Sequence, residues 1–288
     1  MSKSLIVYFS QGGTTARVAE AIASGMRLSK YLVDMCNIKD GTPPEIKGYD
    51  LLGIGLPVYW YRPPFNVMDY LNGLPELEGL PVFVFVLYGT YRGDTSTTIR
   101  RLLARKGARE VGYFYCRGDD AFWGYLKMGY LFSPGHPVEG ELAKAKEFGQ
   151  AVTAHVAGKH YIKPEQERPP AAIYRMERFL ANRWMCENIF SRMFTANAKK
   201  CNRCGLCIKL CPSQNITEGK HGYPKWGRNC LTCFTCELKC PMDAVSSPID
   251  WPIFLPLLSY NIRRALRDSS LDHVRIIHTG GQTKLVQG

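Results

Sequence analysis

At residues 201–212 the chain reads Cys201-Asn-Arg-Cys204-Gly-Leu-Cys207-Ile-Lys-Leu-Cys211-Pro212, and at residues 230–241 it reads Cys230-Leu-Thr-Cys233-Phe-Thr-Cys236-Glu-Leu-Lys-Cys240-Pro241. Both stretches have the spacing Cys-x2-Cys-x2-Cys-x3-Cys-Pro. Three thiolates at this spacing around a tight turn can bind three irons of one cubane, while the fourth, on the helix that follows, points to a second cluster. The repeated spacing therefore predicts two [4Fe–4S] clusters.

The spacing also predicts which cysteines share a cluster, because the fourth cysteine of each stretch crosses to the other cluster. One predicted cluster is held by Cys201, Cys204, Cys207 and Cys240, and the other by Cys230, Cys233, Cys236 and Cys211. Gly205 allows the backbone to approach an inorganic sulfide closely enough to donate a hydrogen bond. Zinc is the less favoured interpretation, since zinc sites use pairs of cysteines at wider separation. Disulfides would require an oxidising compartment, which nothing else in the chain indicates.

The 288 residues are enough for about two domains. Of the 11 cysteines eight belong to the two stretches, and the apolar neighbours of Cys36, Cys116 and Cys186 predict buried structural thiols. The N-terminus leads directly into Leu5–Phe9, which predicts a strand and not a signal peptide. No apolar run reaches the ~20 residues that a membrane-spanning helix needs. We therefore expect a cytoplasmic protein without a transmembrane segment.

The first 158 residues alternate between strand and helix patterns. Short apolar runs, typical of buried parallel strands, predict strands at Leu5–Phe9, Tyr31–Ile38, Asp50–Tyr59, Pro81–Leu87 and Glu110–Cys116. Apolar residues at helical spacing predict helices at Thr14–Lys30, Phe65–Leu71, Thr95–Lys106 and Pro137–Ala157. This alternation predicts an α/β domain with a doubly wound five-stranded parallel sheet. Its ligand is expected beyond the carboxyl ends of the strands.

Three loops at those carboxyl ends have the chemistry of a binding site. The first, Ser10–Thr15, opens onto a helix and offers backbone amides and hydroxyls to an anion. It has no lysine, so it is not a nucleotide triphosphate loop. The second, Gly55–Pro64, offers aromatic rings for stacking on a flat ligand. The third, Tyr88–Asp94, has glycines that permit backbone contact. The predicted binding residues are Ser10, Gln11, Gly12, Gly13, Thr14, Thr15, Pro57, Val58, Tyr59, Trp60, Tyr61, Gly89, Thr90, Tyr91 and Gly93.

These loops and the cysteine stretches together resemble the flavodoxin–ferredoxin fusion proteins, in which a flavodoxin-like domain precedes a small α+β dicluster ferredoxin domain. The resemblance covers roughly residues 3–158 and 197–250. It implies flavin mononucleotide (FMN), with its phosphate on Ser10–Thr15 and its isoalloxazine between the Trp60 and Tyr91 loops. The chain departs from the usual phosphate loop, Thr/Ser-x-Thr-Gly-x-Thr, because Gly12 stands at the middle threonine. That change removes one hydroxyl donor.

The expected domain boundaries follow from these assignments. They are 1–158 for the flavodoxin-like domain, 159–196 for a linker and helix, 197–250 for the ferredoxin domain and 251–288 for a C-terminal tail. Within 159–196 the polar stretch Glu165–Pro170 is expected to be the linker itself.

Residues 119–137 are crowded with aromatic side chains, which either fill a core or form a lid over the flavin. The tail either clamps the ferredoxin domain or forms a partner surface.

The formal net charge is +12, which two clusters and a flavin phosphate would lower. Basic residues gather at Arg92–Arg109, Arg168–Lys200 and the group Arg263, Arg264, Arg267. Such residues form either a solvated face or a docking surface for an acidic redox partner. Nucleic-acid binding is not predicted, because no groove-reading element is evident.

The sequence predicts an electron-transfer iron–sulfur flavoprotein. Clusters pass single electrons, whereas flavin can hold one or two and so connects the two kinds of chemistry. Such a protein would act as an oxidoreductase on a partner protein or a small acceptor. The alternative is an electron-carrier or docking subunit of a larger redox complex, with no substrate of its own. No catalytic residue is assigned.

Overall fold

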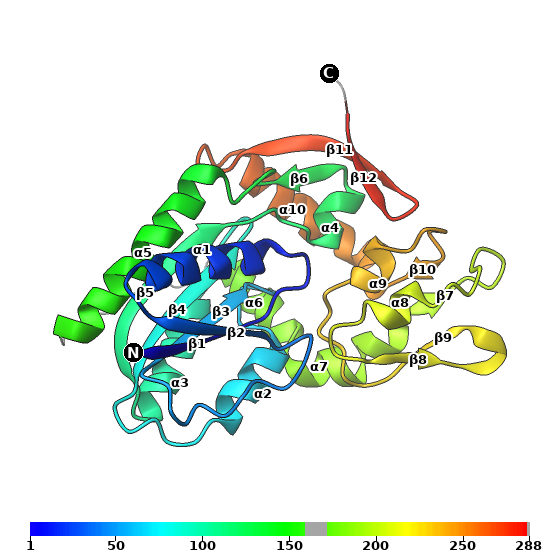
Figure 1. The fold of residues 1–288 in the computed structure, drawn as a ribbon. Helices are drawn as coiled ribbons and strands as arrows, with labels where there is room; N and C mark the ends of the chain where they lie inside the picture. Colours follow the sequence, from blue (N-terminus) through cyan, green and yellow to red (C-terminus); the bar gives the residue numbers. More distant parts are fainter. Residues whose placement is uncertain (159–171, 287–288) are drawn as a thin grey trace. The chain divides into compact units, whose positions relative to one another are not determined.

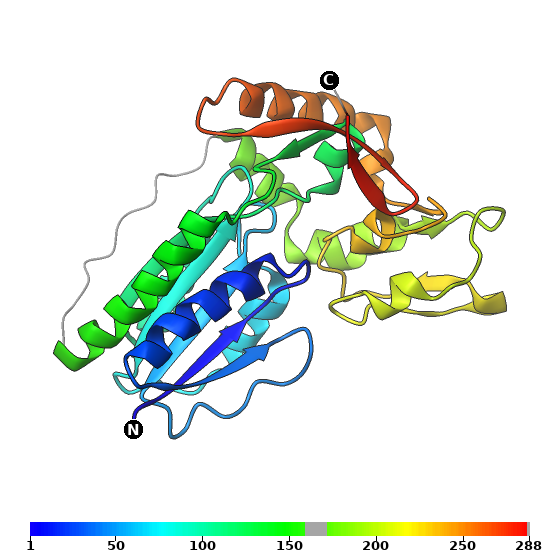
Figure 2. The same cartoon turned by 45° about the horizontal axis from the view of Figure 1, so that its top comes forward.

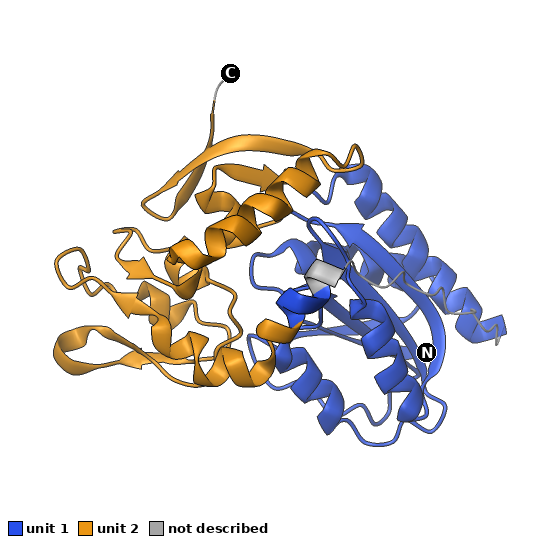
Figure 3. Cartoon of the chain, turned by 180° about the vertical axis from the view of Figure 1, so that it is seen from behind, with its two compact units in different colours: residues 1–119, 135–178 blue, residues 120–134, 179–288 orange. Residues whose placement is uncertain are grey.

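The computed structural model describes residues 1–158 and 172–286. The predicted linker at Glu165–Pro170 and the start of the basic stretch Arg168–Lys200 lie outside the described residues. The chain divides into two compact units (Figure 3). The first comprises Met1–Asp119 and Gly135–Arg178, and the second Asp120–Pro134 and Phe179–Gly288. Each unit therefore contains two separate segments of the chain.

The first unit has a five-stranded parallel sheet in the order β2-β1-β3-β4-β5. This is the doubly wound order 2-1-3-4-5 of the flavodoxin-like fold, and it confirms the predicted architecture. The strands are β1 (Lys3–Tyr8), β2 (Leu32–Asn37), β3 (Leu51–Pro57), β4 (Pro81–Tyr88) and β5 (Arg109–Arg117). The inner strands β1, β3 and β4 are buried along most of their length, as their apolar sequences require.

Glycines on β3 make room for aromatic side chains of the next strand. A Cβ atom added at Gly53 would lie 2.3 Å from the Phe83 ring, and one added at Gly55 would lie 1.9 Å from the Phe85 ring. Both phenylalanines are fully buried. The two glycines on β3 and the two rings on β4 therefore form one packed layer of the core.

Helices from residues 1–158 cover the sheet, in the pattern that Figures 1 and 2 show. They are α1 (Thr14–Leu28), α2 (Phe65–Gly73), α3 (Thr95–Arg105) and α5 (Glu139–Gly158). Helices α1 and α5 lie side by side on one face, where Gly25 and Gly149 permit close approach. A Cβ at Gly25 would lie 1.9 Å from the Lys146 carbonyl oxygen, and one at Gly149 would lie 2.1 Å from the Ile22 carbonyl oxygen. Helix α6 (Ala172–Leu180) follows the undescribed stretch.

The second unit contains the cysteine stretches and two short two-stranded sheets. Strand β7 (Thr195–Ala196) pairs with β10 (Val245–Ser246), and β8 (Ile216–Glu218) pairs with β9 (Pro224–Trp226). Short helices α8 (Leu206–Lys209) and α9 (Thr235–Leu238) each contain the third cysteine of one stretch. Helix α7 (Arg183–Asn188) leads into this region, with 3-10 turns η1 (Phe190–Met193) and η2 (Lys220–Gly222).

The segment 120–134 and the C-terminal tail build a further layer of the second unit. The segment forms α4 (Trp123–Lys127) and β6 (Tyr130–Phe132). The tail forms η3 (Pro248–Asp250), η4 (Pro252–Phe254), α10 (Leu255–Leu266), β11 (His273–Thr279) and β12 (Gln282–Leu285). Strand β11 pairs with both β12 and β6. Both segments thus have a packing role in the second unit.

The tail also contacts the end of the second cysteine stretch. The Thr279 hydroxyl donates a hydrogen bond to Asp243, and the Gly280 amide donates to the same carboxylate at 3.0 Å. A Cβ at Gly281 would lie 2.9 Å from the Lys239 carbonyl oxygen. No helix among the described residues is long and apolar enough to cross a membrane.

Candidate functional site

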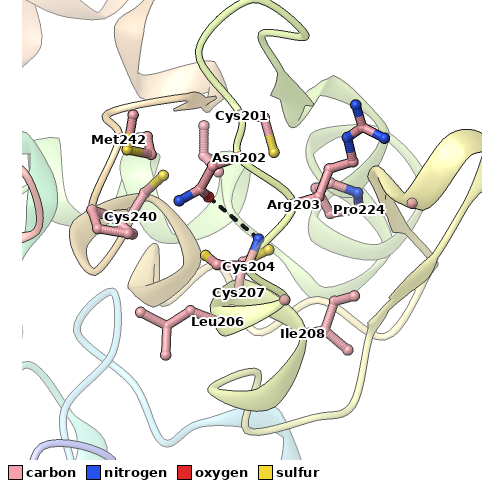
Figure 4. A pocket seen from close by; sticks show the side chains of 14 residues that line it. Cys201, Asn202, Arg203, Cys204, Leu206, Cys207, Ile208, Pro224, Cys240 and Met242 are labelled. Atoms are coloured by element: carbon pink, nitrogen blue, oxygen red, sulfur yellow. Dashed lines mark hydrogen bonds between the residues drawn. The ribbon is translucent and has the colours of Figure 1, made fainter.

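Four cysteines that are far apart in sequence line one pocket of the second unit. Cys201, Cys204 and Cys207 come from the first stretch, and Cys240 is the last cysteine of the second stretch. Figure 4 shows these four side chains around the pocket, together with Arg203. The fourth cysteine of the second stretch is therefore grouped with the first three of the other.

The remaining four cysteines are grouped in the same crossed way. Burial is the main cause that raises the pKa of the Cys230 thiol, and the nearby Cys233 and Cys211 raise it further. Burial also raises the pKa of Cys236 well above its ordinary value. Cys233, Cys230 and Cys211 act in the same direction, and a hydrogen bond with Trp226 opposes them. Cys211, the last cysteine of the first stretch, thus lies in the electrostatic neighbourhood of the second.

The two stretches share an unusual backbone. Arg203 (φ 59°) and Thr232 (φ 51°) hold equivalent positions, as do Gly205 (φ 69°) and Phe234 (φ 56°), and all four adopt the left-handed conformation. That conformation costs a non-glycine residue roughly 1–2 kcal/mol, so tertiary contacts must hold Phe234 in it. The repeated sequence spacing is therefore accompanied by a repeated chain path.

The crossing cysteines accept equivalent hydrogen bonds. The Asn215 amide donates to the Cys211 sulfur at 3.2 Å, and the Ala244 amide donates to the Cys240 sulfur at 3.3 Å. In both cases the donor lies four residues after the cysteine. Amide donors of this kind stabilise thiolate, the form that binds iron, and tune a cluster's potential. The cysteine thiols and the amides that donate to them therefore have the chemistry that iron–sulfur clusters require.

Within the part of the chain that the structure describes, no three His, Cys, Asp or Glu side chains are close enough to share one metal ion.

In the first stretch, burial is the main cause that raises the pKa of the Cys207 thiol, to about 11. An amide hydrogen bond from Ile208 opposes the shift, while Cys201, Cys240 and Cys204 add to it. These four thiols are thus electrostatically coupled.

The second stretch is covered by residues from elsewhere in its own unit. The rings of Phe122 and Phe194 lie 6.0 Å and 5.9 Å from the Phe234 ring. Lys127 on α4 forms a salt bridge of 2.8 Å with the buried Glu237, and it also pairs with Asp250. In the first stretch, by contrast, Asn202, Arg203 and Cys204 are exposed. Lys127 and Phe122 were not predicted as part of the site, because they lie more than 100 residues before it in the sequence.

The three predicted loops of the first unit meet at one edge of the sheet. The Tyr59 hydroxyl donates a 2.6 Å hydrogen bond to the Gln11 side chain, joining the first loop to the second. A Cβ added at Gly93 would lie 2.3 Å from the Tyr61 carbonyl oxygen, so the second and third loops are also in close contact. A Cβ at Gly118, after β5, would lie 3.0 Å from the Thr14 side chain.

The first loop is shaped to receive an anion. Gly13 caps α1 in the left-handed conformation, and no acidic residue occupies the first turn. A Cβ added at Gly12 or Gly13 would meet nothing within 4 Å, so the backbone is open to a ligand. Ser10 is held by two hydrogen bonds with Asn37 at the end of β2, a residue that the sequence reading missed. This helix N-terminus fits the phosphate of FMN.

The second loop is an aromatic turn with a strained backbone. Tyr59 and Arg62 exchange two backbone hydrogen bonds of 2.9 and 3.0 Å, which leaves Trp60 and Tyr61 as the central residues of the turn. Both have positive φ angles, 51° and 59°, at positions where asparagine and glycine are usual. Such strain clusters at binding sites. Tyr61 is 8% exposed and packs in the core, whereas Tyr59 and Trp60 are half-buried. Of the rings of this turn, those of Tyr59 and Trp60 are therefore the ones that an isoalloxazine could reach.

The third loop is braced from two sides. The Arg92 guanidinium lies over the Tyr115 ring, 4.2 Å from its centroid. Asp94 pairs with Arg178 from α6. Neither contact was predicted, because Arg178 lies 84 residues after Asp94 and Tyr115 is on a different strand from the Arg92 loop. Arg178 thus connects the segment after the linker to the predicted flavin edge of the same unit.

Two family models match the chain, one in each unit. Residues 5–119 match the flavodoxin domain, and residues 193–241 match the 4Fe-4S dicluster domain. Among curated proteins, an uncharacterized protein of Methanocaldococcus jannaschii is 28% identical over 153 residues, which is 52% of this chain and 97% of the relative. Flavodoxin 1 of Salmonella typhimurium is 28% identical over 121 residues, covering 39% of this chain and 68% of the relative.

Solved flavodoxin structures are similar to part of the chain. A flavodoxin from the domain Archaea covers 55% of this chain and 99% of its own, with 19% identity and a TM-score of 0.42. Oxidised flavodoxin 1 from Bacillus cereus covers 54% of this chain and 99% of its own, with 19% identity and a TM-score of 0.42.

Proposed function

We propose that the chain exchanges electrons between two [4Fe–4S] clusters and one FMN, as an oxidoreductase that serves a partner protein or a small acceptor. The chain joins a flavodoxin domain to a 4Fe-4S dicluster domain and is thus an electron-transfer iron–sulfur flavoprotein. The observation that carries the proposal is the grouping of Cys240 with Cys201, Cys204 and Cys207 around one pocket. Crossed ligation of two cubanes requires that grouping.

In this proposal the eight motif cysteines hold the clusters. The first cluster takes Cys201, Cys204, Cys207 and Cys240, and the second takes Cys230, Cys233, Cys236 and Cys211. The amides of Ala244 and Asn215 donate to the sulfurs of the crossing cysteines at 3.3 and 3.2 Å. These donors delocalise thiolate charge and so favour the reduced state of the cluster beside them.

The three loops of the first unit hold FMN. The backbone of Gly12 and Gly13, with the hydroxyls of Ser10 and Thr15, provides donors for the phosphate at the start of α1. Trp60 and Tyr91 hold the isoalloxazine between their loops, with Gly89, Thr90 and Gly93 allowing close backbone contact. When bound, the flavin supplies conversion between one-electron and two-electron transfer. The chain itself fixes the orientation of the ring.

The test is an anaerobic titration of the purified protein with FMN, followed by the flavin and tryptophan fluorescence. Wild-type protein should take up one FMN per chain. Trp60→Ala should weaken binding by about tenfold to a hundredfold, because lost stacking and buried aromatic area cost on the order of 1–3 kcal/mol. Thr15→Ala should weaken the binding of FMN but leave that of riboflavin, which lacks the phosphate, unchanged.

A matched control is Trp184→Ala, which removes an exposed tryptophan of the second unit. It should leave FMN affinity unchanged. If wild-type protein with full cluster content binds no FMN at any concentration, the electron-carrier alternative replaces the proposal.

A further inference from the structure

The first cysteine stretch is surrounded by exposed positive charge. Residues 199–225 contain six basic side chains and a single acidic one, Glu218. The six are all exposed, and they are Lys199, Lys200, Arg203, Lys209, Lys220 and Lys225. Most are neighbours in sequence of residues that line the four-cysteine pocket, such as Cys201, Ile208 and Pro224. We call this set the basic rim.

The four-cysteine pocket beside the basic rim also has apolar side chains in its lining. Leu206, Ile208 and Met242 line the pocket together with the cysteines, and Met242 is 43% exposed. Figure 4 shows these three side chains and Arg203 around the cysteine sulfurs. An apolar centre with a polar rim is the anatomy of a protein–protein interface, and transient redox encounters use small ones.

The second stretch has no comparable surface. Leu231, Thr232 and Phe234 are buried, and so is Glu237, which Lys127 neutralises. Beside the second stretch the exposed basic residues are Arg228 and Lys239, so solvent-exposed positive charge is denser at the first cluster site. Charge arranged in this way steers an oppositely charged protein to one point on the surface.

We propose that the basic rim is the docking surface for an acidic one-electron carrier protein, and that electrons enter or leave the chain through the cluster of Cys201, Cys204, Cys207 and Cys240. The inference rests on the proposed function. One electron passes between the partner's redox centre and this cluster, so that one is oxidised as the other is reduced. No bond is made or broken.

The occupant follows from the chemistry of the surface. Positive charge around a pocket requires a negative partner, and the position beside the cysteines requires a redox centre within that partner. Nucleic acid also carries negative charge, but the basic rim lies beside a pocket lined by cysteines and apolar side chains, which a nucleic-acid backbone has no use for. A redox protein is therefore the better match.

The experiment is anaerobic stopped-flow mixing of the holoprotein with an acidic plant-type [2Fe–2S] ferredoxin, a one-electron carrier with a potential near −400 mV, in both directions: oxidised holoprotein with reduced ferredoxin, and reduced holoprotein with oxidised ferredoxin. Cluster bleaching gives the second-order rate constant as a function of salt. The variant Lys209→Glu/Lys225→Glu should slow the reaction at low salt by about tenfold to a hundredfold, because steering raises association rates by factors of that order. Its rate should also depend less on salt than that of wild type.

The matched control is Arg101→Glu/Arg105→Glu, which makes the same charge change on exposed residues of α3. It should slow the reaction less than the basic-rim variant, because it makes the same change in net charge but leaves the basic rim intact. Iron content and the electron paramagnetic resonance spectrum of the reduced clusters should be the same in all three proteins.

Equal slowing of both variants, or slowing of the α3 variant alone, would overturn the inference. So would wild-type clusters that exchange electrons with the ferredoxin in neither direction at any salt concentration, or a short DNA duplex that displaces the ferredoxin at equal concentration. Flavin reduction is recorded separately in the same experiment. If the clusters bleach with the expected salt dependence while no flavin is bound or reduced, the proposed function fails and the docking surface stands.

Discussion

The first cysteine stretch presents Asn202, Arg203 and Cys204 to solvent, whereas Leu231 and Thr232 at the first two of these positions in the second stretch are buried. The backbones are nevertheless alike, down to the left-handed conformation at Gly205 and Phe234. The comparison shows that the repeated spacing determines a shared chain path, and that the residues between the cysteines determine what surrounds each cluster site.

The difference arises from segments outside the repeat. Helix α4 brings Lys127 to Glu237, and Phe122 and Phe194 bring their rings beside Phe234. The tail turn at Gly280 and Gly281 contacts residues 239–243 at the end of the second stretch, whereas Asn202, Arg203 and Cys204 of the first stretch stay exposed. One cluster site is therefore shielded and the other accessible.

The largest expected effect is loss of a whole cluster. Cys240→Ala should remove about four irons and abolish the signal of the cluster at the first stretch, because it deletes one of four ligands. Cys211→Ala should do the same for the second stretch. Iron and sulfide analysis with electron paramagnetic resonance measures both. Cys116→Ala, which removes a buried thiol of the first unit, is the control and should leave the iron content unchanged. If Cys240→Ala removed the cluster of Cys230, Cys233 and Cys236, or Cys211→Ala removed that of Cys201, Cys204 and Cys207, crossed ligation would be contradicted.

Phe234→Gly should destabilise the second stretch strongly. The change relieves left-handed strain of roughly 1–2 kcal/mol, but it removes a buried ring worth about 3–5 kcal/mol. We expect a net loss of about 1–4 kcal/mol, seen as a lower urea midpoint for loss of cluster absorbance. An unchanged midpoint would mean that the ring contacts with Phe122 and Phe194 contribute little.

Lys127→Met should destabilise the same region by about 1–3 kcal/mol, because it leaves the carboxylate of Glu237 buried without its cation. The loss is smaller than for a fully buried pair, since Lys127 is about one-third exposed. Adding Glu237→Gln should restore most of the stability, whereas Lys144→Met on the surface of α5 should cost nothing measurable. A double variant as unstable as the single one would contradict the electrostatic explanation. The urea midpoint measures all three.

Gly205→Ala should have the smallest effect. The added Cβ would meet nothing within 4 Å, so the cost is the backbone strain at φ 69°, about 1 kcal/mol. The exposed stretch should keep its cluster, with a slightly lower urea midpoint. Complete loss of the first cluster would show that a close approach between Gly205 and the cluster, which the added Cβ would block, matters more than the strain.

The fold and the grouping of the loops could be predicted from local sequence signals. Strand runs such as Pro81–Leu87 are apolar throughout because both faces of a parallel sheet are buried, and that pattern is visible without a structure. The cysteine spacing is equally local, since three thiolates around one turn lie within seven residues. Ser10–Thr15 and Tyr59–Tyr61 were recognisable because parallel strands bring their carboxyl ends to one edge.

Tertiary structure alone decided what lies next to these elements. The sequence carried no signal that residues 120–134 leave the first unit and pair with the tail through β6 and β11, because strand pairing between distant segments depends on register and burial of both partners. For the same reason the pairing of Lys127 with Glu237, more than 100 residues apart, could not be foreseen. The sequence determined where the cluster cysteines are. Tertiary packing determined that one stretch is shielded and the other lies open within the basic rim.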